Sequence, residues 1–213
     1  MRRFRCAGKG SGCRRGGGGE PPVGRELRVA FLGRLDPVKG LKTLLEAMQR
    51  IPGVQVRLDA YCLTQDPAAA SELAQIRKHA ASDSRIQFLE PVPATDVVSV
   101  LGQYDVLAVP SLCLETGPLV VYEAFAARVP VIGSRLGGIA ELVTHEKNGF
   151  LVERGDVDGW ARAFERLVRE PGWIARLRAG IPLPRTMETV AREMDDIYAA
   201  ALGRRVLSAE ACK

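Results

Sequence analysis

The chain has 213 residues, of which 46% are hydrophobic, which is enough apolar material for one large domain or two small ones. No apolar run approaches the about 18 residues of a membrane-spanning helix, and the basic N-terminus lacks the apolar stretch of a signal peptide, so we expect a cytoplasmic protein. The net charge of +5 comes from residues 1–25, which carry +6, so the rest of the chain shows no charge balance typical of nucleic-acid binding.

Residues 1–25 are rich in glycine and arginine and too poor in apolar residues to fold alone. We expect a leader here, more typical of a linker, a fusion remnant or a misplaced start than of an anion-binding tail, and a single folded domain over residues 26–213. The five cysteines follow no CxxC spacing and the two histidines lie on separate segments, so the sequence predicts no metal site.

The first predicted strand covers residues 27–33 and ends at Gly33, and apolar residues at helical spacing follow over 41–48. Arg34 and Lys39 fall on the loop between them, at the carboxyl end of the strand, where open α/β sheets bind ligands. A planar guanidinium and a compact ammonium are complementary ways to hold a diphosphate. From the residues alone, ordinary solvated loop charges are an equal alternative.

Strands and helices alternate along the rest of the chain. Further strands are predicted at 54–60, 85–89, 104–110, 130–133 and 150–152, and further helices at 67–81, 94–103, from Pro118, 137–143, from a cap at Asp156, 173–179 and 186–202. This alternation predicts the α/β class: one Rossmann-like domain with a mostly parallel sheet of about six strands and helices on both faces. Neither GxGxxG after the first strand nor GxxxxGK[ST] occurs, which disfavours dinucleotide dehydrogenases and P-loop enzymes.

Two carboxylates flank a Gly-Pro helix start within residues 114–127. We place Pro118 at the first helical position, with Gly117 as a permissive cap, so the exposed N–H groups there form an anion site suited to phosphate. Glu115 precedes this helix, and Glu123 lies about 7 to 8 Å along it, where a carboxylate can accept hydrogen bonds from vicinal hydroxyls. A solvated helix face is an equal alternative for Glu123 on spacing alone.

Gly137 and Gly138 open the next predicted helix. They would let the backbone approach a bound ligand, or they would simply form a tight turn, and the sequence favours neither.

Four motifs in order resemble the C-terminal, donor-binding domain of retaining glycosyltransferases of the GT-B fold, group 1 or family 4. They are FLGRLDPVKG at 31–40, VPS at 109–111, ETGPLVVYEAFAARVPVIGSRLGGIAELV at 115–143 and NGFLV at 148–152. The resemblance covers nearly everything from about residue 27 to the end of the chain. It implies metal-independent transfer of a sugar, with retained configuration, from a UDP- or GDP-sugar to an acceptor hydroxyl, with no further cofactor.

The resemblance also implies roles, position by position. Arg34 and Lys39 would neutralise the donor diphosphate, Glu115 would contact the transferred sugar, and Glu123 would hold the ribose. Glu115, Arg34 and Lys39 are therefore the candidate catalytic residues, with Glu115 positioning the sugar rather than attacking it. The other expected donor contacts are Gly33, Gly117, Pro118 and Leu119, with the base near Pro91 and Val92.

Two features depart from the family. Arg128 stands where relatives usually have glycine, which predicts strained packing or a cation that points outward. About 26 residues precede the first strand, so we expect no N-terminal acceptor domain, and the helix at 186–202 would pack on that missing domain. The expected partners are a nucleotide sugar and an N-terminal acceptor-domain polypeptide, with peripheral membrane association through that half and no specific nucleic acid.

The sequence leaves more than one function open. We favour the donor-binding half of a hexosyltransferase in polysaccharide biosynthesis, incomplete without its acceptor domain. The alternative is a nucleotide-sugar-binding module or fragment without transferase activity of its own. A nucleic-acid binder would rest on residues 1–25 alone, and the family also contains epimerases.

Overall fold

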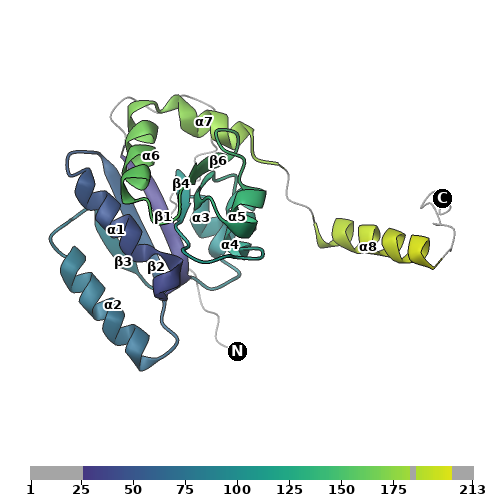
Figure 1. Ribbon diagram of the computed structural model, residues 1–213, viewed down its shortest axis with the longest axis horizontal. Helices are drawn as coiled ribbons and strands as arrows, with labels where there is room; N and C mark the ends of the chain where they lie inside the picture. The colour runs from purple at the N-terminus through teal and green to yellow at the C-terminus, as the bar shows by residue number, and fades with distance from the viewer. Residues whose placement is uncertain (1–25, 183–185, 203–213) are drawn as a thin grey trace, which may run out of the picture.

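The central sheet is parallel throughout, with the strand order β3-β2-β1-β4-β5-β6 (Figure 1). The computed structural model describes residues 26–182 and 186–202, so the leader expected at 1–25 lies outside the described residues. The strands are β1 (Leu27–Arg34), β2 (Val56–Leu63), β3 (Ile86–Leu89), β4 (Val106–Val109), β5 (Val131–Ser134) and β6 (Gly149–Val152). The expected α/β class, with a mostly parallel sheet of about six strands, is confirmed.

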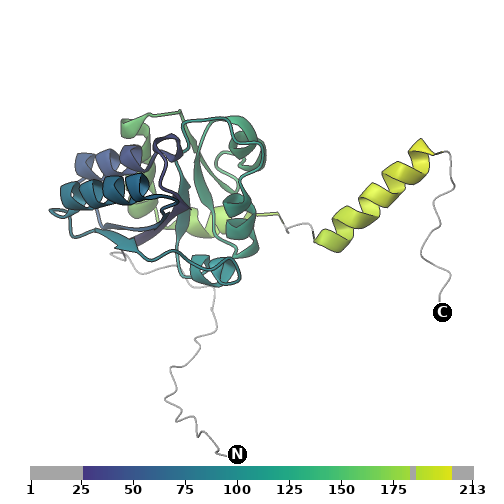
Figure 2. The same ribbon diagram turned by 90° about the horizontal axis from the view of Figure 1, so that it is seen from below.

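Helices cover both faces of this sheet (Figures 1 and 2). Their bounds are α1 (Leu41–Arg50), α2 (Pro67–Ala80), α3 (Val97–Leu101), α4 (Leu119–Ala126), α5 (Gly137–Leu142), α6 (Val157–Arg169), α7 (Gly172–Ala179) and α8 (Met187–Ala201). Buried side chains of α1, α2, α6 and α7 pack in the core on one face, and those of α3, α4 and α5 pack on the other. Strands whose two faces are both covered must be apolar on both, which explains their continuous apolar runs.

The sheet order reverses between β1 and β4, and this reversal places the candidate site. From β1 the chain proceeds outward through β2 to β3, then returns to β4 beside β1 and proceeds outward in the other direction. The helices that follow, α1 and α4, therefore lie on opposite faces. The loops at the carboxyl ends of β1 and β4 diverge at such a point and leave a crevice, which is where open α/β sheets bind ligands.

The predicted elements agree with the structure to within a few residues, with two local differences. Pro118 is the N-cap of α4 in an extended conformation, not its first helical residue, so the helix begins at Leu119. A short 3-10 turn, Pro37–Lys39, interrupts the loop after β1, and its apolar content is too small to produce a periodic signal.

Helix α8 occupies the predicted position of the last helix but lies apart from the sheet in both views (Figures 1 and 2). None of its described residues is buried, and Met187, Ile197 and Tyr198 are each more than half exposed. That α8 packs on an acceptor domain stays a prediction. Of the helices in the described ranges, none combines the length and the apolar content needed to cross a membrane.

Candidate functional site

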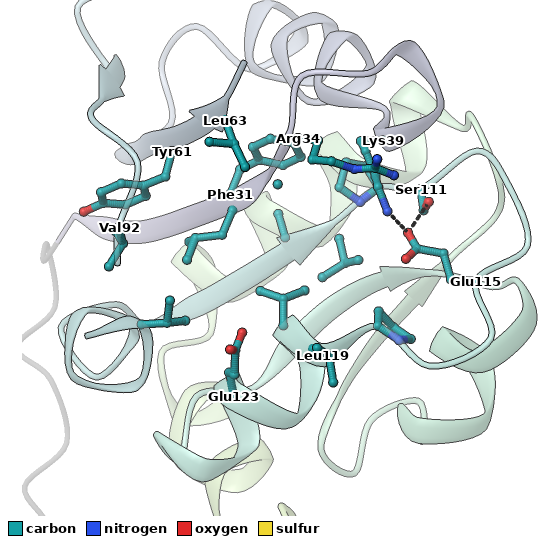
Figure 3. Close-up of a pocket in the computed structure, with 18 of the residues that line it drawn as sticks. Phe31, Arg34, Lys39, Tyr61, Leu63, Val92, Ser111, Glu115, Leu119 and Glu123 are labelled. Atoms are coloured by element: carbon teal, nitrogen blue, oxygen red, sulfur yellow. Dashed lines mark hydrogen bonds and ion pairs between the residues drawn. The ribbon is translucent and has the colours of Figure 1, made fainter. Parts of the chain in front are cut away.

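A pocket of about 560 Å³ opens at the carboxyl ends of β1 and β4 (Figure 3). Its wall includes all eight residues that the sequence and the family resemblance suggested: Gly33, Arg34, Lys39, Glu115, Gly117, Pro118, Leu119 and Glu123. They come from the end of β1, the two diverging loops and the first two turns of α4. The structure thus brings the candidates together, and the role of each one stays a prediction.

Before they separate toward opposite faces of the sheet, the loop after β1 and the loop after β4 are in contact. The Asp36 carboxylate accepts a hydrogen bond from the Val38 N–H at 3.0 Å and begins the 3-10 turn. Gly40 ends this turn with φ of +73°, and a Cβ there would lie 2.0 Å from the Pro110 carbonyl oxygen. The Leu112 N–H also donates to the Val38 oxygen at 2.7 Å. Lys39 therefore projects from a loop whose backbone is fixed on both sides.

Lys39 and Glu115 form an ion pair across the pocket, with 3.0 Å between Nζ and Oε1. The hydroxyl of Ser111 donates to the same Oε1 at 2.6 Å (Figure 3). Ser111 is buried, and it lines the pocket at the end of β4. Ser111 was not among the predicted site residues, although it lies in the VPS motif, because its contact with Glu115 requires the fold of the intervening loop.

The backbone of the Glu115 loop rests on the first turn of α5. The Gly138 N–H donates to the Glu115 carbonyl oxygen at 2.6 Å, and a Cβ at Gly138 would lie 2.7 Å from that oxygen. Gly137 has φ of +49°, and a Cβ there would lie 3.0 Å from the same carbonyl oxygen. The two glycines thus admit a neighbouring backbone, a purpose that neither sequence-based alternative included.

Arg34 and Glu123 lie on the other walls of the pocket. The Arg34 guanidinium is exposed and donates to the Gln65 amide oxygen at 3.3 Å. Glu123 projects from α4 into the pocket, away from the Lys39–Glu115 pair (Figure 3). Partial burial raises the pKa of the Glu123 carboxyl, because the charged form loses hydration there.

Apolar side chains line the side of the pocket away from the Lys39–Glu115 pair. Tyr61 and Val92 lie there (Figure 3), and Phe31, Pro91 and Val97 also belong to the pocket wall. Pro91 and Val92 are the positions where the family resemblance implies the nucleotide base. The Lys39–Glu115 pair and the Tyr61–Val92 wall thus occupy opposite sides of one pocket.

Arg128 has the backbone strain that its replacement of a glycine led us to expect, and its side chain has specific partners. Its backbone has φ of +60°, a left-handed conformation that explains why glycine suits this position. The guanidinium remains exposed and donates to the carbonyl of Arg178, in the last turn of α7, at 3.0 Å and to that of Ile181, just after the helix, at 2.9 Å. A cation at the C-terminal end of a helix is favourable because the helix dipole is negative there.

Within the described part of the chain, no three His, Cys, Asp or Glu side chains gather closely enough to hold a metal ion. The described cysteines, Cys62 and Cys113, are free thiols. Burial raises the pKa of Cys62 to about 11, which leaves it a neutral core side chain. Cys113 is half-buried, with its sulfur 3.7 Å from the Ser111 hydroxyl.

Comparisons with known sequences and structures identify what the chain is similar to. Residues 26–170 match the sequence model of a family described as glycosyl transferases group 1. Over 144 residues the chain is 35% identical to a D-inositol 3-phosphate glycosyltransferase of Mycobacterium marinum, and this match covers 68% of the chain and 31% of the relative. The chain thus spans about a third of the length of this curated relative.

Two solved structures show the same fold. The Anabaena protein HepE, in complex with UDP-glucose, is 23% identical with a TM-score of 0.72, over 84% of this chain and 50% of HepE. The C-terminal domain of the group 1 glycosyl transferase LpcC from Francisella tularensis is 22% identical with a TM-score of 0.61, over 72% of this chain and 81% of that domain.

Proposed function

The chain belongs to the glycosyl transferases of group 1 and has the fold of the C-terminal half of a GT-B glycosyltransferase, and from this premise we propose that it binds a nucleoside-diphosphate sugar in the pocket between β1 and β4. In this proposal it supplies the donor-binding half of a retaining, metal-independent transfer of a sugar to an acceptor hydroxyl. The expected cytoplasmic location remains part of the proposal.

The observation that carries the proposal is the order of chemical groups along one pocket. Lys39, Arg34 and the start of α4 can meet a diphosphate, Glu123 can accept hydrogen bonds from a ribose, and the Tyr61–Val92 wall can take a base. A volume of about 560 Å³ lies within the range of small-molecule sites. HepE was solved with UDP-glucose, which supports a uridine nucleotide as the first donor to test.

The ion pair between Lys39 and Glu115 suggests how the donor is received. A diphosphate carries more negative charge than a single carboxylate, so it would replace Glu115 as the ion-pair partner of Lys39. Glu115, still held by Ser111, would then accept hydrogen bonds from hydroxyls of the sugar. When the bond between the sugar carbon and the diphosphate oxygen breaks, its electron pair goes to the diphosphate, and Arg34 and Lys39 would stabilise that charge. The acceptor hydroxyl oxygen forms the new bond to the sugar carbon, and its proton passes to the departing diphosphate. We assign no side chain as general base.

The acceptor side of the reaction requires more than the described residues. The curated relative is about three times as long as the matched segment. The proposal therefore includes an acceptor-binding half, on this or another polypeptide, and places no acceptor residue in this chain. A second candidate function is a nucleotide-sugar-binding module without transfer, since the groups that line the pocket would suffice to hold a donor.

Nucleotide binding by the full chain tests the proposal. At a hundred times its dissociation constant, UDP, GDP or ADP should add about 2.7 kcal/mol to the free energy of unfolding, measured by thermal denaturation. Glu123→Ala should lose this gain, while Glu141→Ala, which removes an exposed carboxylate of α5 outside the pocket, should keep it. The absence of stabilisation by every nucleotide would contradict the proposal.

A transfer assay separates the two candidate functions. Sugar transfer from the bound donor, once an acceptor-binding half is supplied, would identify the chain as a catalytic half. Donor binding without transfer in any such combination would identify it as a binding module.

A further inference from the structure

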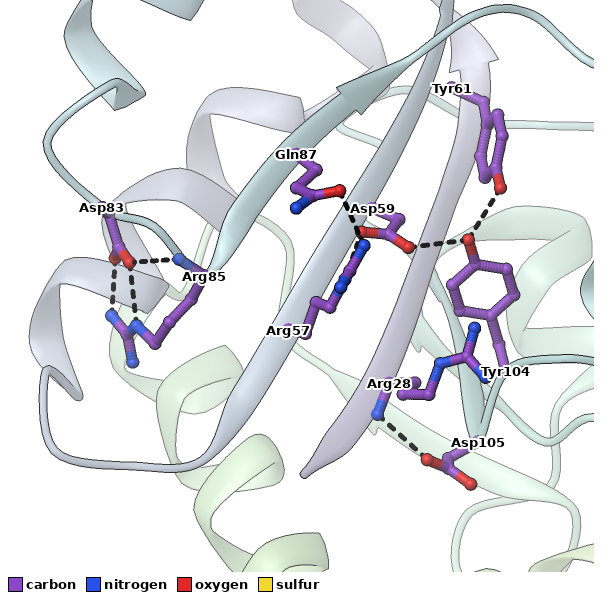
Figure 4. A network of polar contacts seen from close by, with 9 residues as sticks. All are labelled: Arg28, Arg57, Asp59, Tyr61, Asp83, Arg85, Gln87, Tyr104 and Asp105. Atoms are coloured by element: carbon purple, nitrogen blue, oxygen red, sulfur yellow. Dashed lines mark hydrogen bonds and ion pairs between the residues drawn. The ribbon is translucent and has the colours of Figure 1, made fainter. Parts of the chain in front are cut away.

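A buried carboxylate interrupts the apolar strand β2. Asp59 is only 3% exposed, and its oxygen accepts a hydrogen bond from the Arg57 Nε at 2.9 Å (Figure 4). Arg57 also donates to the Gln87 side chain at 2.6 Å, across the pairing of β2 with β3. A buried charge is costly unless it is paired and hydrogen-bonded, so the position of Asp59 requires an explanation.

The second oxygen of Asp59 leads to two tyrosines. The Tyr104 hydroxyl donates to it at 2.9 Å, and the Tyr61 hydroxyl lies 2.7 Å from the Tyr104 hydroxyl (Figure 4). The two rings meet edge to face, with centroids 6.3 Å apart. Because alternate residues of a strand point to one face, Asp59 and Tyr61 project from β2 in the same direction.

The direction of these hydrogen bonds can be assigned by counting protons. An ionised carboxylate only accepts, and the guanidinium of Arg57 stabilises that charge. Burial raises the pKa of Tyr104, so its hydroxyl keeps a proton at neutral pH. That single proton is donated to Asp59, so Tyr61 must donate its own proton to Tyr104. The hydroxyl of Tyr61 is thereby fixed to the sheet.

The ring of Tyr61 lines the pocket, while its hydroxyl is held in this chain of hydrogen bonds. Val92 lies beside it in the same wall, remote from the Lys39–Glu115 pair (Figure 3). An aromatic side chain offers a face or an edge to a planar base, and any of the bases can stack on it because each has a flat π-face. A freely rotating ring would lose conformational entropy when a ligand binds, and a ring held in advance loses less.

We propose that Tyr61 forms a wall of the nucleobase subsite, and that Tyr104 and Asp59 are positioning residues that hold its ring in place. The inference rests on the proposed function of the pocket as a nucleotide site. It adds residues from β2 and from the segment before β4 that do not belong to any of the four motifs. It predicts that these residues act on the base and not on the diphosphate.

The test compares UDP with inorganic pyrophosphate, which lacks the base, by calorimetric titration of the full chain. Tyr104→Phe removes the hydroxyl that joins Tyr61 to Asp59, and it should weaken UDP binding about threefold to tenfold, the range of one hydrogen bond. Tyr61→Ala should weaken UDP binding on the order of tenfold or more through lost stacking. Neither variant should change the dissociation constant of pyrophosphate.

Two further variants make the outcomes distinguishable. Tyr122→Phe alters a half-exposed tyrosine of α4 outside the pocket wall and should change neither constant. Lys39→Ala should weaken both ligands. An unchanged ratio of the two constants in Tyr104→Phe and Tyr61→Ala would overturn the inference, even if their melting temperatures fall, because a purely structural role predicts that result. If the unmodified chain binds neither ligand, the proposed function fails and the inference fails with it.

Discussion

Ser111 is a small side chain whose hydrogen bond determines where Glu115 can go. Its hydroxyl donates to Glu115 and is itself buried, so removal would free the carboxylate to rotate. We expect Ser111→Ala to weaken binding of UDP-glucose by about 1 kcal/mol and to leave UDP binding unchanged, because Glu115 is proposed to contact the sugar alone. Calorimetric titration with both ligands measures the difference. Ser99→Ala, which alters an exposed serine of α3, is the control. Equal losses for both ligands would contradict this role of Glu115.

Glu123 should make nucleotide binding sensitive to acid. Because burial raises the pKa of its carboxyl, Glu123 takes up a proton at a higher pH than an ordinary glutamate. The charged form accepts hydrogen bonds from both hydroxyls of a ribose, so affinity should be constant near neutral pH and fall as the pH is lowered through this raised pKa. Glu123→Gln should bind more weakly at neutral pH and lose that acid dependence.

The same burial has a consequence for stability with the opposite sign. A raised carboxyl pKa means that the ionised form is less favourable in the folded state than in the unfolded chain. The resulting loss of stability is complete above the folded pKa and falls to zero as the pH drops below the unfolded pKa. Glu123→Gln should therefore not lower the melting temperature at neutral pH. A variant that both binds poorly and unfolds early would indicate a structural role for Glu123 instead.

At the scale of elements, the turn before α1 depends on a glycine. Gly40 has φ of +73°, and a Cβ there would lie 2.0 Å from the Pro110 oxygen, so Gly40→Ala must displace one of the two loops that hold Lys39. We expect a loss of at least about 1 to 2 kcal/mol in the free energy of unfolding, measured by urea denaturation. Gly53→Ala is the matched control, because a Cβ there meets no described atom within 4 Å. Equal stability of the two variants would contradict the model of a fixed loop.

Arg128 allows the backbone and the side chain to be separated experimentally. Arg128→Gly removes the two hydrogen bonds to the end of α7 but relieves the left-handed backbone, whereas Arg128→Ala removes the bonds and keeps the strain. The glycine variant should therefore be more stable than the alanine variant by about 1 kcal/mol in urea denaturation. The reverse order would indicate that the backbone is not strained at this position.

The sequence predicted those features that depend on local periodicity. The apolar spacing over 41–48 identified α1, and its apolar positions are buried in the core. Asp156 was also predicted to cap the helix that follows it, and its carboxylate accepts a hydrogen bond from the Gly159 N–H. Such signals are contained within one or two turns, so no knowledge of the tertiary structure is needed to find them.

Features that depend on pairing between distant segments were not predicted. Tyr61 and Tyr104 meet only because the fold brings β2 and the segment before β4 together, so that the two side chains touch. No local sequence pattern marks either tyrosine. The Gly138 contact with the Glu115 loop likewise needs the position of α5. The residues that the family resemblance selected line one pocket, but the resemblance did not indicate that Lys39 and Glu115 form an ion pair.

For the whole molecule, α8 is the element whose removal should cost least. None of its described residues is buried, while its apolar residues, including Met187 and Ile197, face outward. Deletion of residues 183–213 should therefore leave the melting temperature of the rest unchanged in scanning calorimetry, because the described residues of α8 contribute no buried side chain to the core. A clear fall in melting temperature would show that this segment packs against the domain, and it would weaken the prediction that α8 packs on an acceptor domain.

The charges in the pocket wall also determine how a ligand arrives. The two cations Arg34 and Lys39 are matched by the two carboxylates Glu115 and Glu123, so these four charged residues of the pocket wall carry no net charge together. Long-range attraction of an anion depends on net potential, whereas contact depends on individual groups. These four residues would therefore contribute little long-range attraction to an anionic donor. Discrimination between ligands would arise after entry, when the phosphate replaces Glu115 as the partner of Lys39.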